Sequence, residues 1–157
     1  PLAAPMSFDG KYLFTGSDGI RRFRLEGEDL IYEESSQRLA SGHTTHCALS
    51  VDGEWTAMPT GGGNGNGYDI FVFAASDLTE HKLDLDNGAY PCAIGWDPKT
   101  GNIYAPNSSK LNVFNSKGEE LVELDHGLRD PRRIIVHPAG EMFVLWSEKK
   151  IVVYRVR

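Results

Sequence analysis

Charged side chains are concentrated in residues 125–133, and this stretch is one candidate for binding an anionic group. It contains Arg129, Arg132 and Arg133, together with acidic residues and a histidine. A guanidinium group matches a carboxylate or phosphate through paired hydrogen bonds, so these arginines are the candidate binding residues. The alternative is a solvated loop whose charges pair with each other, since surface ion pairs are common and weak.

A glycine-rich segment at residues 61–67 is the second candidate, and it contains Asn64 and Asn66. It is not a phosphate-binding P-loop, because no Gly-Lys-Ser/Thr follows and the next predicted element is a strand. It approximates one copy of a calcium-binding nonapeptide, but that chemistry needs stacked copies to surround an ion. We therefore expect a flexible hairpin loop that can serve in recognition, with Asn64 and Asn66 as its candidate contacts.

Metal chemistry is not predicted from the histidines and acids. His43 and His46 are three residues apart and Asp52 follows nearby, but a zinc site needs a further convergent ligand that the sequence does not supply. Structural roles are therefore expected for His43 and Asp52, and for Asp97, which lies in a similar turn. No metal and no cofactor is predicted.

A repeated turn indicates the strands that position these residues. Comparable turns follow residues 8, 51, 96 and 137, at Asp9-Gly10, at Asp52-Gly53, from Asp97 to Gly101, and from Pro138 to Gly140. The spacings are 43, 45 and 41 residues, and short strands flank each turn. A repeat of this size made of short strands predicts the blades of a β-propeller.

The predicted fold is all-β, with about four blades of antiparallel strands at residues 3–40, 41–88, 89–127 and 128–157, the last of them incomplete. Residues 69–74 are apolar on both faces, as expected of a strand between neighbouring blades. Four blades could close alone, but about 40 residues per blade suits rings of six to eight. We expect a partial ring, completed by blades outside this sequence or by a second copy.

The composition of the chain limits the classes of partner that we expect it to bind. The 157 residues carry a net charge of −6, which disfavours nucleic acid or an anionic membrane as the main partner. The chain has no apolar run of the length that a membrane span needs. Cys47 and Cys92 occupy equivalent places in neighbouring repeats, so both are expected to be free, buried and inert. The expected partners are another protein or a second copy that completes the ring, and a small ligand.

The repeats resemble several propeller families. The run Ser41-Gly42-His43-Thr44 before Cys47–Trp55 resembles the entry of a WD repeat, in which the histidine bonds within the blade. The closing Trp-Asp pair of that family is missing from every repeat. The segments Gly101–Tyr104 and Lys110–Phe114 look more like blades of the YVTN and NHL types. This resemblance implies a propeller fold, which serves in both binding and catalysis.

Residues 131–140 also resemble a blade of lactonase-type propeller enzymes. Those enzymes commonly have a Pro-Arg-His run here and a glutamate after the next strand, whereas this chain has Arg133 in place of the histidine and Glu148 near the place of the glutamate. The first hypothesis is therefore a non-catalytic interaction module, which presents its inter-blade loops to a protein or small ligand. A lactonase-like enzyme that uses Arg132, Arg133 and Glu148 is the alternative, and a purely structural assembly unit is a third hypothesis.

Overall fold

The computed structural model describes residues 10–16, 19–36, 47–59, 70–81, 93–129 and 131–156, and within them it contains fourteen β-strands and no helix. The first two sheets contain β1 (Tyr12–Gly16), β2 (Ile20–Glu26) and β3 (Asp29–Ser35), and then β4 (Ala48–Leu49), β5 (Trp55–Pro59), β6 (Ile70–Ala74) and β7 (Glu80–His81). The last two contain β8 (Gly95–Trp96), β9 (Ile103–Pro106), β10 (Lys110–Phe114) and β11 (Glu120–Asp125), and then β12 (Arg133–Val136), β13 (Met142–Trp146) and β14 (Ile151–Arg155).

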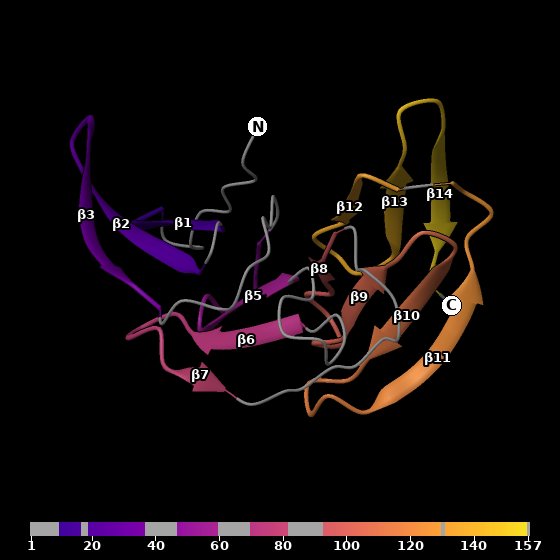
Figure 1. The fold of residues 1–157 in the computed structure, drawn as a ribbon, viewed down its shortest axis with the longest axis horizontal. Helices are drawn as coiled ribbons and strands as arrows, with labels where there is room; N and C mark the ends of the chain where they lie inside the picture. Colours follow the sequence, from indigo (N-terminus) through magenta and orange to yellow (C-terminus); the bar gives the residue numbers. More distant parts are fainter. Residues whose placement is uncertain are drawn as a thin grey trace.

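Each sheet is antiparallel, and its strands follow one another in chain order from one side of the sheet to the other. The second and third sheets have four strands, and the first and fourth have three. Figure 1 shows the four sheets side by side around an arc, with β3, β7 and β11 on its outer side. The predicted all-β fold, with sheets arranged as propeller blades and a shorter last sheet, is confirmed. The strand expected at residues 3–8 lies outside the described residues.

The repeated turn between the first two strands of each blade depends on glycine. Gly10, Gly53, Gly101 and Gly140 all have φ between 66° and 73°, a region that residues with a Cβ rarely adopt. Three of these turns have the same closing bond, in which the glycine N–H donates to a carbonyl three or four residues earlier. The N–O distance is 3.0 Å from Gly53 to Ser50, and 2.8 Å from Gly140 to His137. The repeated glycine in the sequence therefore corresponds to a repeated backbone conformation.

Strand β6 shows how one strand serves two interfaces. Because side chains alternate along a strand, Phe73 packs in the core between the first and second sheets, while Ile70 and Val72 pack in the core between the second and third. Phe73, Ile70 and Val72 are all at most 1% exposed. Both faces of the strand are buried, as its apolar sequence predicts.

The third and fourth sheets meet through a similar core with an aromatic stack at its centre. The rings of Tyr104 on β9, Phe143 on β13 and Tyr154 on β14 follow one another, with centroids 5.0 Å and 4.9 Å apart. Leu111 and Leu145 are buried beside them. Each pair of neighbouring sheets thus encloses its own hydrophobic core, which is the packing expected of adjacent blades.

The strand that begins the third sheet lies against those that begin the second and fourth sheets, since β8 contacts both β4 and β12. The approach at Gly95 on β8 is especially close. A Cβ built there would lie 2.9 Å from Val136 Cγ2 and 3.0 Å from Ile134 Cγ2, both on β12. Glycine at position 95 therefore sets the spacing between these two sheets.

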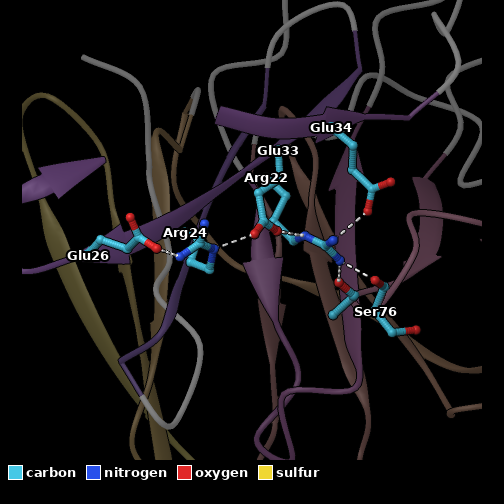
Figure 2. Close-up of polar contacts among 7 residues, drawn as sticks. Arg22, Arg24, Glu26, Glu33, Glu34 and Ser76 are labelled. Atoms are coloured by element: carbon cyan, nitrogen blue, oxygen red, sulfur yellow. Dashed lines mark hydrogen bonds and ion pairs between the residues drawn. The ribbon is translucent and has the colours of Figure 1, made fainter. Parts of the chain in front are cut away.

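An ion network joins the first sheet to the second (Figure 2). Arg22 on β2 donates to the carbonyl of Ala75 at 2.8 Å and to that of Ser76, both in the turn after β6. Its guanidinium also binds Glu33 at 3.0 Å and Glu34 at 2.7 Å on β3. Arg22 thus connects two carboxylates of its own sheet to the backbone of the neighbouring one, a contact that no motif in the sequence indicates.

Candidate functional site

The candidate site lies where two connections meet beside the fourth sheet. One is the link from β11 to β12, which carries Arg129 and Arg132, and the other is the hairpin between β13 and β14 at residues 147–150. The link enters β12 at Arg133 and the hairpin leaves β13 at Trp146, and these two residues are paired. Both connections therefore lie at the same end of the fourth sheet. Their side chains can therefore line one surface.

His126 holds the link in place and is buried, with 3% of its surface exposed. Its Nδ1 accepts a hydrogen bond from the Leu128 N–H at 3.1 Å, so the proton of the neutral ring lies on Nε2. That Nε2 donates to the Asn107 carbonyl at 3.1 Å, in the β9–β10 hairpin. The Tyr154 hydroxyl donates to the His126 carbonyl. The link is thereby anchored to both the third and the fourth sheet.

The hairpin is closed by Ser147 and Lys150. The Ser147 N–H donates to the Lys150 carbonyl at 2.9 Å, and the Lys150 N–H lies 3.2 Å from the Ser147 hydroxyl oxygen. The link joins the same strand, because the Arg132 N–H donates to the Trp146 carbonyl at 2.6 Å. Backbone hydrogen bonds therefore hold both connections in place, and the long side chains extend from them.

Together the two connections enclose an open cavity of about 370 Å³. Its lining is formed by Gly127, Leu128, Arg129, Arg132, Ser147, Glu148, Lys149 and Lys150. Four of these side chains are cationic and one is a carboxylate, although the whole chain is acidic. The lining therefore contains more cationic than anionic side chains, a composition that suits an anion.

Glu148 is paired within the cavity. Its Oε1 lies 2.5 Å from Arg132 Nη2, and the two side chains are 69% and 63% exposed. An ion pair this exposed contributes little to stability, about 0–1 kcal/mol. It places the Glu148 carboxylate against the Arg132 guanidinium.

Arg133 does not join this group. It is the first residue of β12, directly opposite Trp146 on β13, and its guanidinium carbon lies 5.9 Å from the Trp146 ring centroid. Consecutive residues at the start of a strand point to opposite faces, which separates Arg133 from Arg132. Of the three residues that the lactonase resemblance implies, the structure therefore brings together Arg132 and Glu148 only.

The other predicted site residues are distributed as follows. Asn64, Asn66 and His43 lie outside the described residues. Asp52 is exposed in the β4–β5 turn, where its Oδ1 accepts bonds from the Ser50 hydroxyl at 2.5 Å and the Glu54 N–H at 3.1 Å. These contacts are local to the turn.

Asp97 occupies the corresponding turn between β8 and β9 and is 1% exposed. Its carboxylate accepts bonds from the Lys99 N–H at 2.9 Å, the Thr100 hydroxyl at 2.7 Å and the Tyr104 hydroxyl at 3.3 Å. Burial raises the pKa of Tyr104 to about 12, and the negative charge of Asp97 adds to this shift. These contacts join the β8–β9 turn to β9.

Sequence reasoning missed His126, Ser147, Lys149 and Lys150. A usable signal existed for the two lysines, because the run Ser147-Glu148-Lys149-Lys150 separates two predicted strands and must form their hairpin.

Among the described residues, no group of three or more His, Cys, Asp or Glu side chains is arranged to hold a metal ion. No helix long and apolar enough to cross a membrane occurs in the described part of the chain.

Comparison with known proteins places the fold. No protein-family model matches the sequence, and no curated protein matches it. Solved structures do match, in 757 chains. One is Kuenenia stuttgartiensis hydrazine synthase, a β-propeller-containing protein, with a TM-score of 0.74 and 18% sequence identity. The match covers 92% of this chain and 41% of that one, and at this identity it establishes the propeller-like fold alone.

Proposed function

We propose that this chain is a non-catalytic propeller module that binds an anionic group in the cavity between the β11–β12 link and the β13–β14 hairpin. The observation that carries the proposal is the charge of that cavity, in which four cationic side chains surround one carboxylate. The ligand is a carboxylate or phosphate group, carried by a protein partner or by a small molecule.

The chemistry of the side chains favours recognition over catalysis. Arg129, Arg132, Lys149 and Lys150 carry cationic groups that donate hydrogen bonds. They can attract and orient an anion, but they cannot act as a general base while protonated. Glu148 is the acid–base candidate of the lining, and it is exposed and paired with Arg132.

In this arrangement Glu148 acts as an internal competitor. A ligand carboxylate or phosphate takes the position of the Glu148 carboxylate on Arg132 and gains the nearby lysines in addition. Because the exposed pair is worth about 0–1 kcal/mol, its removal should raise ligand affinity by no more than about fivefold. The substitution Glu148→Gln keeps the size of the side chain and removes its charge.

The test is calorimetric titration of the protein with inorganic phosphate and, separately, with succinate. We expect saturable binding that weakens at least tenfold in Arg132→Ala and strengthens up to about fivefold in Glu148→Gln. Lys117→Ala is the matched control, because Lys117 is exposed in the β10–β11 turn and is not among the residues that line the cavity. Equal binding by all four proteins, or saturable binding by none, would exclude the cavity as an anion site.

The lactonase-like alternative is tested in the same variants. Hydrolysis of a lactone panel that disappears in both Arg132→Ala and Glu148→Gln would show that the exposed pair is catalytic and would replace the binding hypothesis. Since Arg133 contacts Trp146 outside the cavity, Arg133→Ala should leave any such activity unchanged.

A further inference from the structure

The fourth sheet leaves one of its faces apolar and exposed. Cross-strand pairing aligns Ile135 with Val144 and Val153, and Trp146 with Ile151, so these five side chains form one continuous surface. Ile135, Trp146, Ile151 and Val153 are 59%, 43%, 63% and 58% exposed. We call these five residues the fourth-sheet face.

The same sheet uses its opposite face to pack against the third sheet, through Phe143, Leu145 and Tyr154. Both of its faces are thus largely apolar, as are those of β6 in the interior of the arc, although Arg133 lies beside Trp146 on the exposed face. An antiparallel sheet that borders solvent normally alternates apolar and polar positions. The fourth-sheet face is therefore built as an interface between blades and continues the series of interfaces inside the molecule.

The first sheet carries a matching surface on the side away from the second sheet. Phe23 pairs with Leu13 and Tyr32, and Leu25 pairs with Leu30. The Phe23 and Tyr32 rings meet edge to face at 5.7 Å, and Tyr32 and Leu30 are 56% and 52% exposed. We call these five residues the first-sheet face. Figure 1 shows the first and fourth sheets on the two sides of the opening in the arc.

We propose that the fourth-sheet face binds the first-sheet face of a second copy of this chain. A two-fold axis relates two such contacts, so both end faces of both copies are covered at once. The resulting ring has eight sheets, within the range that a repeat of about 40 residues favours. Contact between two fourth-sheet faces would leave both first-sheet faces exposed and would not close the ring.

This interface goes beyond the proposed binding function and does not involve the residues of the anionic cavity. Its side chains are mostly apolar, while each chain carries a net charge of −6. Added salt screens the repulsion between the two chains and strengthens apolar burial. The dimer should therefore tighten, not dissociate, when the salt concentration rises.

Light scattering on a sizing column, over a dilution series, tests the proposal. We expect the wild type to have twice the chain mass of 17.4 kDa, and Ile151→Glu to have the single mass with an unchanged circular dichroism spectrum. Leu121→Glu is the matched control, since Leu121 is 54% exposed on β11 and belongs to neither end face, and it should remain dimeric. A wild type of 17.4 kDa at every concentration would overturn the proposal, and would leave the fourth-sheet face to a blade from other polypeptide.

Mixing two monomeric variants tests which faces meet. Tyr32→Glu blocks the first-sheet face and Ile151→Glu blocks the fourth-sheet face, so each variant alone should be monomeric. A mixture retains one intact pair of faces, between the first sheet of Ile151→Glu and the fourth sheet of Tyr32→Glu, and should form heterodimers more weakly than the wild type. A dimeric Ile151→Glu, or a mixture that stays monomeric, would contradict the proposed pairing.

Discussion

Gly95→Ala tests the contact between the third and fourth sheets most sharply. The added Cβ would lie 2.9 Å from Val136 Cγ2 and 3.0 Å from Ile134 Cγ2, about 0.5–1 Å closer than an optimal carbon contact. Both neighbours are β-branched residues on β12, whose side chains have few alternative rotamers. The strand or the side chains must therefore move.

The size of the effect follows from two opposing contributions. Overpacking by a methyl group typically costs about 1–3 kcal/mol. Replacement of glycine by alanine at a compatible backbone conformation stabilises by about 0.4–1 kcal/mol, through the unfolded chain. The midpoints of these two ranges give a net loss of about 1.3 kcal/mol, and each kcal/mol lowers the melting temperature by about 2–4 °C in a chain of this size.

Urea unfolding measures the loss, and a double-mutant cycle assigns its cause. Val136→Ala removes the Cγ2 atom that the new methyl group meets, so the double variant should be less destabilised than the two single losses combined. Val153→Ala lies on the opposite face of the fourth sheet and should combine additively with Gly95→Ala. A neutral or stabilising Gly95→Ala would refute the close packing of β8 against β12.

Two further predictions concern titrating groups. The hydrogen bond from Arg24, helped by the charge of Arg22, lowers the pKa of Glu33 below 4.5. The stability that this ion pair contributes is present above pH 4.5 and is lost as the pH falls through the lowered pKa. The urea concentration at the midpoint of unfolding should therefore fall more between pH 5 and pH 3 in the wild type than in Arg24→Gln. An equal fall in the two proteins would contradict this prediction. Burial raises the pKa of Cys47 to about 12. In a Cys92→Ser variant, the Cys47 thiol should therefore react with a thiol reagent at pH 8 only as the protein unfolds. Rapid labelling of the native protein would show that the Cys47 thiol is accessible.

Much of the fold could be predicted because each blade repeats the same local physics. The repeated turn glycine corresponds to a repeated positive φ at positions such as Gly53 and Gly140. The apolar run at residues 70–74 is buried on both faces, as its composition requires. Such features depend on neighbours in sequence and on the alternation of side chains, so a single sequence reveals them.

The candidate site was predictable only in part, because it depends on how two connections meet in space. Arg129 and Arg132 could be selected from the charge of their own segment, but Lys149 and Lys150 come from a hairpin later in the chain. Arg132 and Arg133 are neighbours in sequence, yet the start of β12 directs one toward Glu148 and the other onto Trp146. The same limit applies to Arg22, whose backbone partners are more than fifty residues away.

Residue-resolved amide chemical shifts during a phosphate titration test the central claim most directly. If the cavity binds an anionic group, the amides of Gly127, Leu128 and Ser147 should shift along a saturable curve, and Arg132→Ala should move that curve to at least tenfold higher phosphate concentrations. The amide of Lys117, in the β10–β11 turn, should not move with them. Shifts that are absent, or that are spread evenly over the surface and unaffected by Arg132→Ala, would contradict the assignment of this cavity as a binding site.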